Sequence, residues 1–203
     1  MEDIINIEDV KEKMKKQMRY NKGIFGMDQM FMIIAQIDRT GKGKISSKRM
    51  DEFLGKLGIY LSSAEQSELC KYLGKTSEND QISIEQFVNL FKTEIPQSLI
   101  NKVMEVFNKL KENRESKILN RRNLEHAICI KNHPLCKVFK KDEENTLEQF
   151  ENSIKFIVMD KNELNENDFL EIHNNMFYTM PVEEVAYFIK YIPELWGIKV
   201  NDF

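Results

Sequence analysis

Residues 38–49 read Asp38-Arg-Thr-Gly-Lys-Gly-Lys-Ile-Ser-Ser-Lys-Arg49. Asp38 opens this stretch, Gly43 is its sixth residue and the apolar Ile45 is its eighth. An EF-hand calcium loop has this layout, with oxygen ligands at positions 1, 3, 5, 7, 9 and 12 and a glycine at position 6 for the sharp turn. The stretch therefore predicts a helix-loop-helix unit.

Cations stand where two of the oxygen ligands should be. Lys42 is position 5 and Arg49 is position 12, and both side chains only donate hydrogen bonds. Residues 38–49 contain one carboxylate, Asp38, and five cations, so their net charge is 5 − 1 = +4. The cations are Arg39, Lys42, Lys44, Lys48 and Arg49. We expect no calcium here, with Asp38 as the sole weak candidate ligand. Our hypothesis is that Arg49 or Lys42 hydrogen-bonds to Asp38 or to loop carbonyls and holds the unit in one state.

The loop recurs along the chain. Apolar residues that would stand at the centre of such a loop recur at Ile45, Ile82, Ile118 and Leu164. The intervals between them are 82 − 45 = 37, 118 − 82 = 36 and 164 − 118 = 46 residues. We predict an all-α fold of four degenerate EF-hand units in two paired lobes. Short β-pairs should place Ile45 opposite Ile82, and Ile118 or Leu119 opposite Leu164. The predicted parts are an N-terminal helix or arm (1–22), the two EF-hand pairs (23–95 and 96–180) and a C-terminal helix and tail (181–203).

The other three loops depart from the calcium pattern in different ways. The second loop begins at Gly74 and has one residue too many before its central Ile82. Gln86 stands at its last position, where a calcium loop has a bidentate Glu. The third begins with Lys111 and ends near Arg121 and Arg122, and the fourth, from Met159 to Leu164, is about two residues too short to wrap an ion. Weak calcium binding by the second loop stays open, because it contains or adjoins Glu78, Asp80 and Glu85.

Helix signals are frequent. Residues 7–20 predict an amphipathic basic helix with an apolar row of Val10, Met14 and Met18, which either docks on the first lobe or reaches an acidic partner. Further helices are expected over residues 28–37 and 47–57. Three capping boxes are predicted, namely Ser62 with Glu65, Ser83 with Gln86 and Thr146 with Gln149. Four prolines should mark helix boundaries: Pro96, Pro134, Pro181 and Pro193.

Composition excludes several classes of protein. Apolar residues make up 41% and charged residues 31%, and the net charge is −3, so no bulk field favours nucleic acid or a membrane. No apolar run is long enough for a bilayer, and the N-terminal residues are acidic, which predicts a cytoplasmic protein. The odd set of cysteines, Cys70, Cys129 and Cys136, argues against a disulfide scaffold.

Other constellations carry weaker signals. A His-x2-Cys-x3-His-x2-Cys spacing offers zinc ligands, but we expect buried thiols and a helix-capping histidine at His126, Cys129, His133 and Cys136. No nucleophile elbow, phosphate loop or dinucleotide fingerprint is present, so no catalytic residue is assigned. Met27, Met30 and Met32 with Phe25 and Phe31 would line a peptide groove or, as we prefer, a core. The aromatic C-terminal segment around Trp196 should close the second lobe.

Several short stretches resemble the calcyphosin family of EF-hand proteins. They are Gly23-Ile-Phe-Gly26-Met27, Asp38-Arg39, Phe53-Leu-Gly-Lys-Leu-Gly-Ile59, Lys131-Asn-His133-Pro134 and the single Trp196. The resemblance covers about residues 10–197. It implies four EF-hands in two lobes, calcium bound only where ligands stand, and an association with cilia and flagella.

We therefore expect a non-enzymatic, calcium-independent EF-hand-like structural or docking protein of a ciliary axonemal, doublet-microtubule assembly. Its partners would be tubulin or other axonemal proteins, with no cofactor, neither calcium nor zinc. The alternative is a calcium-responsive regulator with one weak or atypical site.

Overall fold

The chain is mostly helical and divides into two compact units, Met1–Thr93 and Glu94–Phe203. The computed structural model describes residues 5–38, 41–74, 81–112, 118–138, 140–158, 161–178, 180 and 182–199. Within these residues, no helix is both long enough and apolar enough to cross a bilayer. The helical content agrees with the predicted all-α class.

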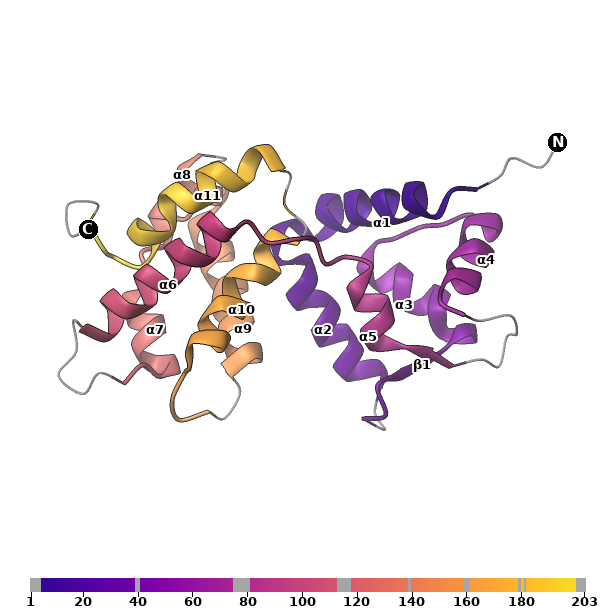
Figure 1. Ribbon diagram of the computed structural model, residues 1–203, viewed down its shortest axis with the longest axis horizontal. Coiled ribbons are helices and arrows are strands. Elements are labelled where there is room, and N and C mark those ends of the chain that lie inside the picture. Colours follow the sequence, from indigo (N-terminus) through magenta and orange to yellow (C-terminus); the bar gives the residue numbers. More distant parts are fainter. Residues whose placement is uncertain are drawn as a thin grey trace. The chain divides into compact units, whose positions relative to one another are not determined.

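Unit 1 contains five α-helices and one pair of short strands among its described residues (Figure 1). In chain order they are α1 (Ile7–Lys22), α2 (Gly26–Ile37), β1 (Lys44–Ser46), α3 (Met50–Leu57), α4 (Ser63–Tyr72), β2 (Gln81–Ser83) and α5 (Ile84–Asn89), with 3-10 turns at Gly23–Phe25 and Ser47–Arg49. The predicted helices over 7–20, 28–37 and 47–57 correspond to α1, α2, and the second 3-10 turn followed by α3.

The two strands of unit 1 join its two loops. β1 pairs antiparallel with β2, and Ile45 lies opposite Ile82. Both side chains are buried, so the pairing fixes the loops around a shared apolar contact. The predicted register is confirmed.

Unit 2 is built from α6 (Gln97–Glu112), α7 (Arg121–Ala127), α8 (Pro134–Lys137), α9 (Glu143–Val158), α10 (Glu166–Phe177) and α11 (Val182–Leu195), with a 3-10 turn at Ile130–Asn132. Between the described residues of its two loops, the Leu164 N–H donates to the Leu119 C=O at 2.8 Å. Leu119 and Leu164 are buried, whereas Ile118 is 42% exposed. Leu119, not Ile118, is therefore the inward partner, because only one of two consecutive extended residues faces the core.

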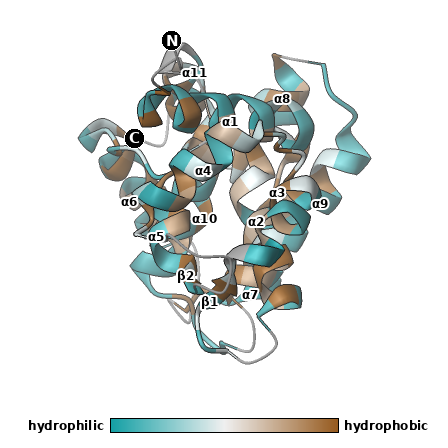
Figure 2. Cartoon of the chain, turned by 90° about the vertical axis from the view of Figure 1, so that its right-hand side faces the viewer, coloured by the Kyte–Doolittle hydropathy of each residue, from teal (hydrophilic) through white to brown (hydrophobic). Residues whose placement is uncertain are grey.

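Figure 2 shows that helices such as α1 carry both hydrophobic and hydrophilic residues. The apolar row of α1, Val10, Met14 and Met18, is fully buried, and α1 contacts α2, α3 and α4. Phe25, Met27 and Met30 are also buried and serve the core of unit 1, whereas Phe31 and Met32 are half-buried. The α1 helix is a docked part of unit 1.

The core of unit 2 is aromatic. Trp196 follows α11 and packs at ring-centroid distances of 5.1 Å from Phe169 and 5.6 Å from Phe150. The Trp196 indole N–H donates to His173 Nε2 at 3.0 Å, and His173 Nδ1 lies 2.8 Å from the Phe169 carbonyl. Because indole is only a donor, His173 must be the neutral tautomer protonated at Nδ1. The C-terminal aromatic segment thus closes unit 2.

Two predicted helix boundaries are wrong. The Thr146 cap fails because α9 begins earlier, at Glu143, where the Asp142 carboxylate accepts from the Asn145 N–H at 2.8 Å. Thr146 lies inside the helix and its hydroxyl donates to the Asp142 carbonyl at 2.6 Å. Pro193 lies inside α11, in the last turn, where a proline removes only one backbone donor.

The remaining boundary predictions hold where the structure describes them. Ser62 and Glu65 form the full capping box of α4, whereas at α5 only half of the predicted box is present, with Ser83 accepting from the Gln86 N–H at 3.3 Å. Pro96 directly precedes α6 and Pro134 is the first residue of α8. Pro181 lies outside the described residues.

Candidate functional site

The first loop uses its acidic residue internally. The Asp38 carboxylate accepts from the Gly43 N–H at 2.6 Å and from the Lys42 N–H at 3.3 Å. Lys42 therefore reaches Asp38 through its backbone, and its side chain is exposed. The side chain proposed as a weak metal ligand is thus a stabiliser of the turn around Gly43, whose φ of +66° favours glycine.

Arg49 ties the end of this loop to its beginning. Its Nη1 donates to the Ile37 carbonyl at 3.3 Å, at the C-terminal end of α2, and its Nε lies 3.5 Å from Glu52 Oε2. A cation is favourable at a helix C-terminus, where carbonyl groups lack intrahelical partners. The hypothesis placed this bond on Asp38 or on a carbonyl of the loop, whereas the acceptor is the carbonyl of Ile37, the last residue of α2.

The other loops share a capping arrangement. One residue after the central apolar residue, a side chain accepts from the backbone N–H three residues later: Ser83 from Gln86, Asn120 from Asn123, and Asn165 from Asp168. In the last two, the later side chain also reaches back to the backbone N–H of the cap, at 3.1 Å in each case. In the third and fourth loops, the side chain at the final position, Asn123 or Asp168, is therefore directed toward its own helix start.

The fourth loop contains a built-in cation. The Lys161 ammonium forms an ion pair with Asp168, whose carboxylate also belongs to the α10 capping box. Asp168 is buried, so this lysine supplies the charge that a buried carboxylate needs. Loops one and four thus each use a side-chain cation, Arg49 and Lys161, for contacts across the loop.

The four His and Cys residues of the proposed zinc spacing are not brought together. His133 is buried and caps α8, accepting from the Leu135 N–H at Nδ1 over 3.1 Å, which confirms the capping role. His126 is exposed. Of the two thiols predicted to be buried, Cys136 is buried, whereas Cys129 is half-buried and its Sγ accepts from Asn132 Nδ2 at 3.3 Å. Within the described ranges, no three His, Cys, Asp or Glu side chains are placed to hold a metal ion.

Comparison with known proteins adds no family. No protein-family model matches the chain, and no curated protein matches it. The resemblance to the calcyphosin family therefore stays a prediction.

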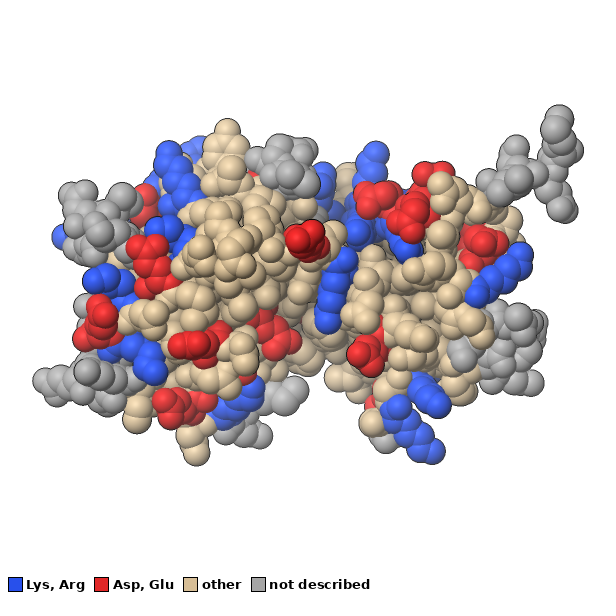
Figure 3. Space-filling view, viewed as in Figure 1, with Lys and Arg blue, Asp and Glu red and all other residues tan. Residues whose placement is uncertain are grey.

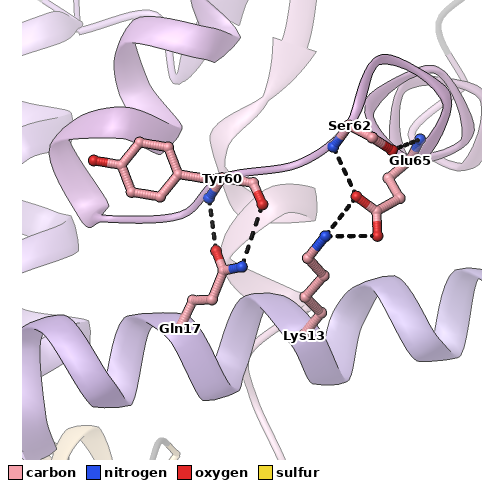
Figure 4. A network of polar contacts seen from close by, with 5 residues as sticks. All are labelled: Lys13, Gln17, Tyr60, Ser62 and Glu65. Carbon is pink, nitrogen blue, oxygen red and sulfur yellow. Dashed lines mark hydrogen bonds and ion pairs between the residues drawn. The ribbon is translucent and has the colours of Figure 1, made fainter.

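A polar row on α1 is the feature that sequence reasoning missed (Figure 4). Lys13 donates to both Glu65 carboxylate oxygens at 2.8 and 2.7 Å, and this contact holds the pKa of Glu65 below its ordinary value. The Gln17 amide accepts from the Tyr60 N–H at 2.6 Å and donates to the Tyr60 carbonyl at 3.2 Å. Asn21 donates to the Gly58 carbonyl at 2.7 Å. We call Lys13, Gln17 and Asn21 the α1 polar row; it fastens α1 to residues 58–65.

The four-residue spacing of the polar row was a usable signal. It runs beside the apolar row of Val10, Met14 and Met18, so both rows face unit 1. The partners at Gly58 and Tyr60 are backbone groups, which no sequence pattern marks.

Two tyrosines next to this row are directed outward. Tyr20, one helical turn beyond Gln17, is 87% exposed, and Tyr60 is 70% exposed although both of its backbone groups are held by Gln17. Figure 4 shows the Tyr60 ring directed away from the Gln17 amide. The arrangement presents aromatic side chains on a fixed backbone, and aromatic residues are enriched at protein-binding surfaces.

Proposed function

We propose that the protein is a non-enzymatic, calcium-independent, EF-hand-like docking component of a ciliary axonemal assembly on doublet microtubules, with tubulin or other axonemal proteins as partners. The helix-loop-helix units are, in this proposal, degenerate EF-hands. Their retained parts are the paired apolar residues Ile45 with Ile82 and Leu119 with Leu164.

One observation carries the calcium-independent part of the proposal. In two loops, a side-chain cation makes the contacts across the loop, Arg49 with the Ile37 carbonyl and Lys161 with Asp168. A covalently attached cation does not dissociate, so such a loop has no ligand-dependent change of state. This supports a fixed scaffold in preference to a calcium switch.

The docking role rests on two further supports. The tyrosines Tyr20 and Tyr60 are exposed, as is typical of aromatic residues at protein-binding surfaces, and the Tyr60 backbone is held by Gln17. The ciliary setting and the tubulin or axonemal partners rest on the calcyphosin resemblance alone.

Calorimetry on the full chain tests calcium independence. Calcium added at millimolar excess should give no saturable heat for the wild type. The Arg49→Glu variant should likewise give no saturable heat, because Lys42 still stands at position 5. Lys42→Asp/Arg49→Glu restores both oxygen donors and should gain binding, which gives the assay a positive arm.

A saturating heat near one site per wild-type chain would instead favour the calcium-responsive regulator. Asp38→Asn then separates the loops: loss of that heat assigns it to the first loop, and its persistence directs attention to the second.

Localisation tests the docking role. Tagged protein expressed in ciliated cells should remain with the axoneme after detergent extraction of the membrane, and cross-linking in situ should then identify its neighbours. Complete release into the detergent-soluble fraction contradicts an axonemal role.

A further inference from the structure

We infer that the exposed side of α1, together with Tyr60, binds an acidic protein segment. The surface consists of Lys16, Arg19 and Tyr20 on α1 and Tyr60 on the connection between α3 and α4; we call it the α1 tyrosine surface. The inference deepens the proposed docking function, on which it rests, by naming the class of partner.

Charge is the first argument. Residues 13–22 contain five basic side chains and no acidic one. Lys13 is paired with Glu65, and Lys15 lies 3.6 Å from Glu12. Among the described residues, Lys16 and Arg19 form no ion pair, and both are exposed. Two cations one helical turn apart are therefore available to carboxylates of a partner.

The tyrosines are the second argument. Tyr20 and Tyr60 are the two most exposed of the large apolar or aromatic side chains described in the chain. Lys16 and Tyr20 are four residues apart on α1 and so share one face. Tyrosine offers a stiff ring and a hydroxyl that donates to carboxylates, and it is enriched with arginine at binding hot spots.

Preorganisation is the third argument. Gln17 holds both backbone groups of Tyr60, and Asn21 holds the carbonyl of Gly58, two residues earlier. Binding at this surface would not have to order the connecting segment, so less conformational entropy is lost. Gln17 is thus a positioning residue for Tyr60.

An acidic protein segment fits this surface better than a nucleic acid or a membrane. Asp9 and Glu12 are exposed on the N-terminal half of the same helix, and the chain as a whole is negative at −3. Figure 3 shows both signs of charge interspersed on the face it displays, without a continuous basic field. A long polyanion would meet these acidic residues, whereas a short carboxylate-rich segment would not.

Fluorescence anisotropy with the purified full chain tests the inference. The probe is a fluorescein-labelled oligoglutamate peptide, with an oligoglutamine peptide as the neutral control. Wild-type protein should bind only the acidic probe, more weakly as salt increases. Lys16→Ala/Arg19→Ala should weaken binding about tenfold or more, and Tyr20→Ala/Tyr60→Ala several-fold. The matched control Lys44→Ala/Lys48→Ala removes two exposed cations from the first loop and should change nothing.

A further variant separates positioning from folding. Gln17→Ala should weaken binding only when Tyr60 is present, so it should have no added effect in a Tyr60→Ala background. Equal effects in both backgrounds would contradict the positioning role.

Three outcomes overturn the inference: no binding of the acidic probe, equal binding by Lys16→Ala/Arg19→Ala, or tighter binding of single-stranded DNA or anionic vesicles at the same ionic strength. None of them affects axonemal retention or the calcium titration. Failure of the inference is therefore distinguishable from failure of the proposed function.

Discussion

The two units solve the same packing problem differently. Each pairs two helix-loop-helix segments and adds a further long helix, α1 in unit 1 and α11 in unit 2, and unit 2 also contains the four-residue α8. Unit 1 joins its loops by a three-residue strand pair and fastens α1 with an exposed polar row. Among its described residues, unit 2 joins its loops by the backbone hydrogen bond between Leu164 and Leu119, and it closes with Trp196 inside an aromatic core that also holds His133 and His173.

The comparison shows where each unit is vulnerable. Both units bury aromatic clusters, Phe53, Phe87 and Phe91 in unit 1 and Phe150, Phe169 and Trp196 in unit 2, and such contacts contribute more to stability than exposed hydrogen bonds. All three histidines of the chain lie in unit 2. Unit 1 should accordingly tolerate acid, whereas unit 2 should not.

Trp196→Ala should have the largest effect and be confined to unit 2. The side chain is 1% exposed and contacts Phe150, Phe169 and His173, so its removal should cost about 3–5 kcal/mol. Amide exchange followed by mass spectrometry would resolve α6–α11 from α1–α5. The converse variant Phe53→Ala should open unit 1 alone. Equal loss of protection in both units after either substitution would remove the distinction between them.

Mild acid should unfold unit 2 before unit 1. Burial lowers the pKa of His133 to about 3 and that of His173 to about 4, from 6.5. Above pH 6.5, neither state is protonated and the histidines have no effect. Below pH 6.5, the unfolded state binds protons that the buried histidines of the folded state do not bind, so the free energy of unfolding decreases as the pH decreases. Between pH 6.5 and 5 each histidine should cost up to about 2 kcal/mol.

Amide exchange at several pH values would measure this, together with Trp196 emission for unit 2. The exposed His126 provides the control, since His126→Gln should leave the profile unchanged. Unit 1 opening first as the pH falls would contradict the assignment.

Sequence reasoning found what local chemistry determines. The spacing of the central loop residues predicted that Ile45 pairs with Ile82, because two loops of the same layout place their central residues opposite each other in the strand pair. It left Ile118 and Leu119 open, since both are apolar and only packing selects between them. It placed one cap at Thr146 instead of Asp142, because both residue types cap helices well.

Side-chain contacts to distant backbone groups could not be predicted from the sequence. Gln17 and Asn21 recognise peptide groups at Tyr60 and Gly58, and any residue has such groups. Similarly, the basic character of residues 7–20 was evident, but the exposure of Tyr60 depends on the path of the connection between α3 and α4.

Gly58→Ala should weaken unit 1 by about 2 kcal/mol and leave unit 2 unchanged. Gly58 has φ +73°, and an added Cβ would lie 2.7 Å from Asn21 Cβ, close to the α1 backbone. Urea unfolding monitored by amide exchange would measure the change. Gly55→Ala is the matched control: its added Cβ meets nothing within 4 Å, and alanine should stabilise α3 by about 0.5–1 kcal/mol. Similar effects of both substitutions would show that the contact between α1 and Gly58 is unimportant.

Lys13→Ala should have the smallest effect, about 0.5 kcal/mol, because its ion pair with Glu65 is partly solvated. The pKa of Glu65 is lowered in the folded state, chiefly by Lys13, so this contribution is present above pH 4.5 and is lost as the pH falls through the folded pKa. Urea unfolding of unit 1 at pH 7 should separate wild type from Lys13→Ala at low salt, and 0.5 M salt should narrow the difference through screening. A difference that persists at high salt would instead indicate that the methylene stem of Lys13 packs against unit 1, and the row would then hold α1 by apolar contact as the aromatic core holds α11.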